Sequence, residues 1–404
     1  MASFVPALAH TSLRGAGRAL ARLARVSPRA PSSTAANASA AAASGGSTPP
    51  GSAGAASSAP LPLGSFGAPI TRPWAEALVE LSQPSATDAT LDLATGEGTC
   101  AFVVADAIEE AKVWGPPAGA GALGGAPAGL AASVLGLDRD RHALARARRT
   151  NEARRDASTD ATDDARVSVT FAWADACHAD APWHEGKERR FARAYCAFGL
   201  NRFADPERAS ARVRETLVPG GPFVVSVWAP LSATNQPLFY AAYVALVETI
   251  DEMETARAAP ERWLVDAKTA AFQHFTAPFD WIEPGADEHG RAIDALERVL
   301  IRAGFDAPDA AVERAGHARF RNLEHAAEAC VGSLPFFREM RNAEGGVFRD
   351  AFLARFEAAL SRAAGDELTF EKDAGAPVVG TEGEGSSVAV PLTAYFAHAT
   401  APWR

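Results

Sequence analysis

The stretch LDLATGEGT, residues 91–99, ends an apolar run on an acid and follows it with two glycines, Gly96 and Gly98. Glycines spaced two residues apart let the backbone turn and come close to a ligand, and they can open the N-terminus of a helix. The spacing Gly96-x-Gly98-x-x-Ala101 also fits the dinucleotide fingerprint G-x-G-x-x-A. An NAD-type oxidoreductase is therefore one interpretation of this stretch.

Strands and helices are predicted to alternate around these glycines. Apolar runs rich in β-branched residues predict strands, and helical spacing of apolar residues predicts helices between them. The expected strands are 90–94, 133–137, 167–173, 191–197 and 222–228, and the expected helices are 73–83, 99–112, 141–152 and 206–217. This alternation predicts an α/β fold with a doubly wound, mostly parallel sheet. A ligand binds such a sheet beyond the carboxyl ends of its strands, where residues 94–98 lie.

The pattern changes after residue 230, where helices are predicted over 237–250, 292–303 and 348–363. Residues 388–398 alternate as a late strand. We expect these helices to cover the ligand cleft and two late strands to complete a seven-stranded, Rossmann-like sheet.

Three acids stand at the ends of three successive predicted strands. Asp92 precedes the glycines, where a carboxylate repels a pyrophosphate but suits a cation such as the amino group of a methionine moiety. Asp138 ends the second strand, where a carboxylate can accept hydrogen bonds from both ribose hydroxyls. Asp175 follows the third strand, at the place for an adenine amino group. A pocket for an amino acid, a ribose and an adenine, without phosphate, matches S-adenosylmethionine and disfavours NAD.

Residues 70–228 resemble a class I S-adenosylmethionine-dependent methyltransferase in four successive motifs. TLDLATGEGT (90–99) is similar to the first motif, and VLGLDRDRHALARAR (134–148) to the second strand with its ribose acid. FAWADACHADAPW (171–183) is similar to the segment after the third strand. The block from YCAF to VPGGPFVVSVW (195–228) resembles the ubiquinone and menaquinone C-methyltransferases. Ala94 replaces the first glycine of the family's motif, and Ala192 replaces an acid common at the fourth strand.

The resemblance implies methyl transfer from the sulfonium of S-adenosylmethionine by in-line displacement. The cofactor is already activated, so positioning and desolvation can supply much of the rate. We assign no catalytic base and no metal ligands. The cofactor-binding residues that we carry over are Asp92, Ala94, Thr95, Gly96, Gly98, Asp138, Arg139, Asp175, Ala176, Cys196 and Phe198.

The acceptor is expected to be a small, partly apolar molecule such as a quinone or lipid precursor. Four aromatic residues, Phe198, Trp228, Phe239 and Tyr240, either line an acceptor pocket or pack in the core. The chain lacks the Asn/Asp-Pro-Pro-Tyr/Phe signature of amino-methylating DNA enzymes, and its net charge of −10 disfavours a phosphate backbone. A methyltransferase-like assembly factor without turnover is the second interpretation, beside the oxidoreductase.

The N-terminal region predicts targeting to an organelle. Five arginines, which all precede the first acid, Glu76, share one face of a potential helix over residues 1–30: Arg14, Arg18, Arg22, Arg25 and Arg29. We expect a mitochondrial transit peptide, or alternatively a chloroplast one. Residues 31–66 are rich in Ala, Ser, Gly and Pro and predict a flexible linker. The methyltransferase domain is then expected over 67–404, with its cofactor half at 67–230. No apolar run is long enough for a membrane span.

Overall fold

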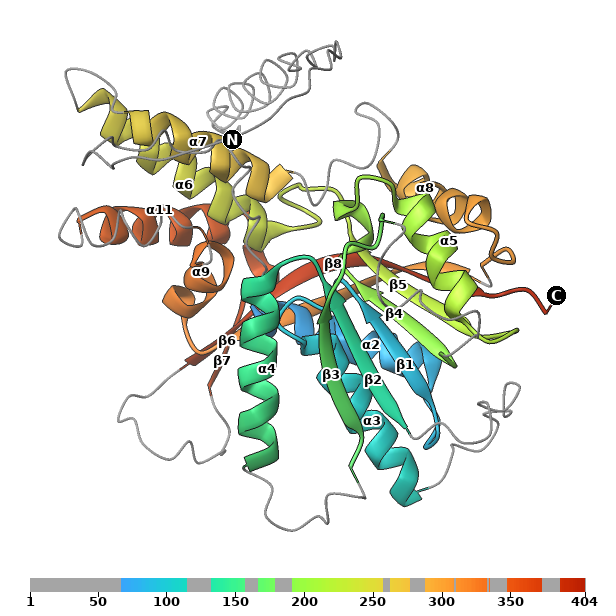
Figure 1. The fold of residues 1–404 in the computed structure, drawn as a ribbon. Coiled ribbons are helices and arrows are strands. Elements are labelled where there is room, and N and C mark those ends of the chain that lie inside the picture. Colours follow the sequence, from blue (N-terminus) through green and yellow to red (C-terminus); the bar gives the residue numbers. More distant parts are fainter. Residues whose placement is uncertain are drawn as a thin grey trace, which may run out of the picture. The chain divides into compact units, whose positions relative to one another are not determined.

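The computed structural model describes residues 67–114, 132–156, 166–178, 191–256, 262–276, 288–308, 310–332, 334, 347–372 and 386–403 (Figure 1). All of them belong to the second of two units into which the chain divides, residues 60–404. The expected transit peptide at 1–30 and linker at 31–66 lie outside the described residues, as do residues 115–131.

The described strands form one mixed sheet whose main path has the order β3-β2-β1-β4-β5-β8-β6. The first five strands are mutually parallel, and β8 runs antiparallel to both β5 and β6. The predicted α/β class and the mostly parallel, seven-stranded path are confirmed. A short additional strand, β7, pairs with the first residues of β8, from Ser386 to Ala389. The strands are β1 (Ala89–Leu93), β2 (Ser133–Asp138), β3 (Ser168–Trp173), β4 (Arg193–Ala197), β5 (Pro222–Trp228), β6 (Ala310–Phe320), β7 (Thr369–Lys372) and β8 (Ser386–Thr400).

Alternation along the central strands divides the core between the two faces of the sheet. In β5, Val225 and Val227 pack into one apolar cluster while Val224 and Trp228 pack into the other. The face of the sheet that carries Val224 and Trp228 is covered by three helices, which pack their apolar side chains against it: α2 (Ala68–Ser82), α3 (Thr99–Trp114) and α4 (Arg141–Asp156). Because both faces are covered, β1 and β5 are buried along their whole length, as the continuous apolar runs predict.

Helix α8 (Glu288–Arg302) lies on the sheet rather than over the ligand cleft, which corrects our expectation for residues 292–303. Its Leu296 and Leu300 pack in the same cluster as Val213 of α5 (Pro206–Thr216) and Val225 of the sheet. Figure 1 shows α5 and α8 side by side. The apolar stripe of α8 predicts a buried face, but it does not say which partner covers that face.

Four further helices form a separate group beside the sheet in Figure 1: α6 (Pro237–Thr255), α7 (Arg262–Thr276), α9 (Leu323–Val331) and α11 (Val347–Ala364). Their apolar side chains, among them Phe239, Phe275 and Phe352, join the core cluster of the α2 face. Two of these helices, α6 and α11, are predicted from the sequence, whereas α7 and α9 are not. No helix within the described ranges is long and apolar enough to cross a membrane.

Helix α2 begins at Ala68, five residues before the predicted start at Pro73. Pro69 stands in the first turn of the helix. A backbone N–H at this position would have no partner within the helix, so the N–H that proline lacks is not needed. The carbonyl of Gly67 accepts the amides of Ile70 and Thr71, so the helix is already established before Pro73. The sequence predicts the helix start at Pro73, but Pro69 is the proline that stands in the first turn.

Candidate functional site

The loop between β1 and α3 alternates left-handed residues with ordinary ones. Ala94, Gly96 and Gly98 have φ values of 56°, 57° and 85°. The Thr95 amide donates to the carbonyl of Leu137, which ties the loop to the neighbouring strand β2. A left-handed conformation costs about 1–2 kcal/mol for a residue with a Cβ atom. Ala94 therefore carries strain at the position where the motif that residues 90–99 resemble has glycine.

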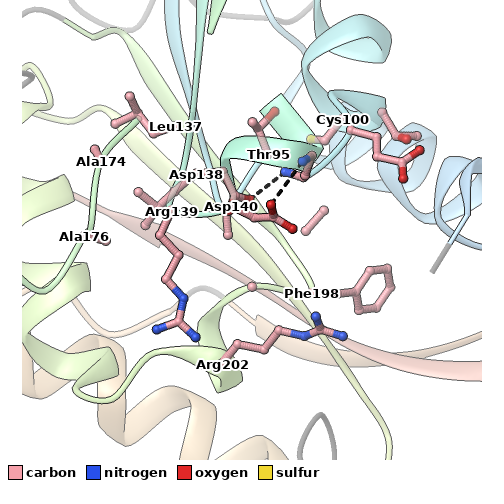
Figure 2. Close-up of a pocket in the computed structure, with 18 of the residues that line it drawn as sticks. Thr95, Cys100, Leu137, Asp138, Arg139, Asp140, Ala174, Ala176, Phe198 and Arg202 are labelled. Atoms are coloured by element: carbon pink, nitrogen blue, oxygen red, sulfur yellow. Dashed lines mark hydrogen bonds between the residues drawn. The ribbon is translucent and has the colours of Figure 1, made fainter. Parts of the chain in front are cut away.

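Asp138 holds this loop at the carboxyl end of β2. Its Oδ2 accepts the amide of Gly96 at 2.8 Å, and its Oδ1 accepts the amide of Asp140 at 2.8 Å (Figure 2). Burial raises the pKa of the Asp138 carboxyl above its ordinary value, against these two hydrogen bonds. An ionised carboxylate has about four acceptor positions, so two stay available for a ligand.

A cavity of about 710 Å³ opens beyond the carboxyl ends of β1 to β4. Its volume lies within the range of roughly 300–1,000 Å³ that is usual for small-molecule sites. Asp138, the last residue of β2, and the following Arg139 line it, and so do Ala174, Asp175 and Ala176 from the segment after β3. The cavity therefore lies at the edge of the sheet where the sequence predicts the ligand.

The β3 side of the cavity combines an acid with a half-exposed indole. Trp173 ends β3 with 45% of its surface exposed, and its Nε1 donates to the carbonyl of Arg139 at 3.0 Å. The guanidinium of Arg141 lies 4.8 Å from the centre of its ring. Asp175 accepts the amide of Cys177 through Oδ1. This side thus presents a planar apolar surface next to hydrogen-bond acceptors.

Phe198 and Arg202 bound the cavity beyond β4. Phe198 has a φ of 57°, and its ring stacks on Trp228 with the ring centres 3.6 Å apart. A bulky residue in the left-handed region is uncommon and often marks a functional site. Arg202 ends the short 3₁₀ helix η3 (Leu200–Arg202) and lines the same cavity. Trp228 and Phe239, by contrast, are fully buried core residues and do not line it, and neither does Tyr240.

Asp92 lies beneath the loop and is completely buried. The Thr95 hydroxyl donates to its Oδ2 at 2.5 Å and stands between it and the cavity. Burial raises the pKa of the Asp92 carboxyl to about 7, and the nearby charge of Asp138 contributes in the same direction. The structure therefore places this acid behind the cavity wall, where its charge acts over a short distance without direct contact.

The raised pKa of Asp92 predicts a pH dependence of stability. Its folded-state pKa of about 7 exceeds the ordinary value of 3.8, so the folded chain holds the proton more tightly than the unfolded chain. Stability from this group is present below pH 3.8 and is lost as the pH rises to about 7, by an upper limit of about 4 kcal/mol.

Asp92→Asn removes this titration, so we expect the variant to be more stable than the wild type at pH 8 and similar to it at pH 4.5. Urea unfolding of the ligand-free chain at both pH values measures the difference. A wild-type advantage at pH 8 would contradict the assignment, since it would mean that the buried carboxylate is well accommodated as an anion.

The structure brings most of the predicted cofactor residues together and sets three behind the surface. Asp92, Gly98 and Cys196 do not line the cavity, and Cys196 is fully buried in β4. Arg202, Trp173, Thr71 and Ala75 line it but were not predicted. The predicted residues that do line it are Ala94, Thr95, Gly96, Asp138, Arg139, Asp175, Ala176 and Phe198.

Comparison with known proteins finds no matching family model and no matching curated protein. Among solved structures, a methyltransferase candidate of Bacillus halodurans is 13% identical, with 81% of this chain and 98% of that chain covered and a TM-score of 0.36. The [4+2]-cyclase SpnF is 14% identical over 82% and 81% of the two chains, with a TM-score of 0.37. Phosphoethanolamine N-methyltransferase 2 of Haemonchus contortus, in complex with S-adenosyl-L-methionine, is 14% identical over 82% and 52%, with a TM-score of 0.38.

Proposed function

We propose that this chain is a methyltransferase that binds S-adenosylmethionine in the cavity at the carboxyl ends of β1 to β4. One observation carries the proposal: Asp138 fixes the glycine loop through Gly96 and still has acceptor positions at the cavity surface. These positions suit a pair of ribose hydroxyls, and Asp175 and Ala176 stand on the adenine side. The sequence motifs at residues 90–99, 134–148, 171–183 and 195–228 support the same assignment.

The acceptor in this proposal is small and partly apolar. Phe198 supplies an aromatic side chain to the cavity lining, to which Ala75 and Ala197 also contribute. A quinone or lipid precursor fits such a lining, in line with the resemblance of residues 195–228 to quinone C-methyltransferases. The cofactor half is assigned to residues 67–230, and the segment from 231 to 404, apart from α8, is assigned to covering the acceptor and completing the sheet. We further propose import into mitochondria through residues 1–30, with the chloroplast as the alternative.

The charges at the cavity disfavour the oxidoreductase alternative. A pyrophosphate placed over the glycine loop would meet the carboxyl group of Asp138, which accepts the amide of Gly96, and would lie above Asp92, whose pKa of about 7 leaves it partly ionised. The assembly-factor alternative is compatible with cofactor binding and differs only in the absence of turnover.

Calorimetric titration of the full chain with S-adenosylmethionine, S-adenosylhomocysteine and NADH tests the proposal. We expect S-adenosylmethionine and S-adenosylhomocysteine each to bind as one molecule per chain, with a dissociation constant in roughly the micromolar range. We expect NADH not to bind. Binding of NADH, or of none of the three, would reject the methyltransferase assignment. Release of S-adenosylhomocysteine in the presence of organellar quinone or lipid extracts then separates an enzyme from an assembly factor.

A further inference from the structure

We propose that the adenine ring of the cofactor packs against the indole of Trp173, beside the guanidinium of Arg141. This inference rests on the proposed function and specifies how the cofactor is held in that site. It makes Trp173 a positioning residue for the cofactor, without a part in the bonds that form and break. Trp173 is not among the cofactor-binding residues carried over from the sequence motifs.

Trp173 is a large apolar side chain at the surface of the cavity. It lines the cavity with 45% of its surface exposed, whereas Phe171 on the same strand is buried. Apolar surface inside a concave site is a place for a ligand, because covering it removes that surface from water. Exposure alone is not the signal, since Trp403 is 64% exposed and does not line this cavity.

Two contacts orient the Trp173 ring. Its Nε1 donates to the carbonyl of Arg139 at 3.0 Å, so the polar edge of the indole is directed at the backbone. The guanidinium of Arg141 lies over the ring, 4.8 Å from its centre, in a cation–π arrangement. Arg141 also lines the cavity. The two side chains together form a surface of flat groups, part aromatic and part guanidinium.

The strand that carries the ring is fastened along its outer edge. Strand β3 ends the main path of the sheet, and α4 lies alongside it (Figure 1). The carbonyl of Val169 accepts a hydrogen bond from the side chain of Asn151. The carbonyl of Phe171 accepts one from the side chain of Arg148. A ring on such a fixed element loses little conformational freedom when a ligand binds, which favours affinity.

The ring is also tied to the acid that is assigned to the ribose. Its hydrogen-bond acceptor, Arg139, follows Asp138 directly in the chain. The amide of Ala174, next to Trp173, donates to the carbonyl of Asp138 at 3.0 Å. Adenine is joined to its ribose by a single bond, so a base whose ribose contacts Asp138 stays close to this backbone. The Trp173 ring is therefore within the reach of that base.

The chemistry of this surface suits the base better than the rest of the cofactor. Adenine is planar and uncharged at neutral pH, and a base packs on an aromatic side chain or a guanidinium through its flat face. The ribose and the amino-acid group have no such face. In this arrangement Trp173 and Arg141 support the face of the base, and Asp175, which lines the same side, accepts from its amino group.

Isothermal titration of the full chain with S-adenosylhomocysteine and with methylthioadenosine tests the inference. Methylthioadenosine has the base and the ribose but no amino-acid group. Trp173→Leu keeps an apolar side chain and removes the flat ring, so we expect both ligands to bind about tenfold more weakly. Trp173→Phe keeps a flat ring and loses only the N–H donor, so both affinities should stay within about threefold of the wild type.

Fluorescence gives a readout that a purely structural role of the indole would not move. Contact between a base and an indole changes the emission of the indole, so S-adenosylhomocysteine should change the emission of the wild type. Trp173→Phe should remove most of this change while it keeps the affinity. Trp403→Phe is the matched control, because it removes another exposed indole that does not line the cavity. It should keep the full change.

Arg141→Gln tests the second half of the surface. The substitution removes the guanidinium and leaves the indole, so we expect a loss of about threefold, equal for the two ligands. A loss for S-adenosylhomocysteine alone would assign Arg141 to the carboxylate of the cofactor and would overturn its part in the inference.

The outcomes separate this inference from the proposed function. Unchanged affinity of Trp173→Leu for both ligands would reject the inference while the proposed function stands. A loss for S-adenosylhomocysteine without a loss for methylthioadenosine would place the ring at the amino-acid end, and would reject it too. If circular dichroism shows that Trp173→Leu does not fold, the affinity and emission of Trp173→Phe decide the matter. Failure of the wild type to bind S-adenosylhomocysteine would reject the proposed function itself, and the inference with it.

Discussion

Asp138→Asn is expected to weaken binding of S-adenosylhomocysteine by about 100-fold, the equivalent of two hydrogen bonds to a charged group. The carboxylate of Asp138 accepts the amides of Gly96 and Asp140 with one oxygen each. An asparagine side chain keeps one acceptor and turns its NH₂ group toward the other donor. The variant therefore loses an acceptor for the ribose and disturbs the loop that shapes the cavity. Isothermal titration of both proteins measures the ratio of the dissociation constants.

Asp140→Asn is the matched control, since it makes the same chemical change two residues away at the edge of the same cavity. Asp140 accepts the amides of His142 and Ala143 at the start of α4, and asparagine serves almost equally well at such a position. We expect its affinity for S-adenosylhomocysteine to stay within about threefold of the wild type. Equal losses in the two variants would mean that net negative charge, and not the ribose contact, governs binding.

The central part of the fold is predictable because its signals are local. The strands from β1 to β5 are short buried runs, each bounded by a turn or a helix start, and their order along the chain determines a parallel sheet. Strand β6 was missed because its residues, among them Glu313, Arg314 and Arg319, favour helix or turn as much as strand. It forms because β8 pairs with it along its whole length, and Trp74 packs closely against Gly316. Such distant pairing is not visible in a local pattern.

The site was predictable where a motif gives both the residue and its place at a strand end. Asp138 and Asp175 are of this kind, and both line the cavity. Arg202 was missed because it reaches the cavity only through the left-handed turn at Phe198, which is not a glycine and gives no sequence signal. Cys196 is expected at the site because the segment 196–201 is predicted to follow the fourth strand. In the structure Cys196 lies within β4 and packs in one core cluster, whereas Phe198 follows the strand in a left-handed turn and packs in the other.

Gly98→Ala should produce a large loss of stability, about 2–4 kcal/mol in the free energy of unfolding, from backbone strain and overpacking together. Gly98 has a φ of 85°, and an added Cβ would lie 2.9 Å from the rings of both Phe102 and Phe171. These rings pack edge to face, with their centres 5.6 Å apart, beneath the loop. The methyl group must therefore displace a packed aromatic pair. Urea unfolding without ligand measures the effect.

Gly96→Ala separates the two causes, because Gly96 is also left-handed, with a φ of 57°, but an added Cβ there would meet nothing within 4 Å. We expect this variant to lose only the backbone contribution, about 1 kcal/mol. Because Gly96 lines the cavity, its added methyl group should instead reduce affinity for S-adenosylhomocysteine. The pair thus assigns one glycine to packing and the other to the ligand. Equal losses of stability would show that the left-handed backbone conformation alone causes the loss at both positions. They would also show that the rings of Phe102 and Phe171 move aside without a measurable cost.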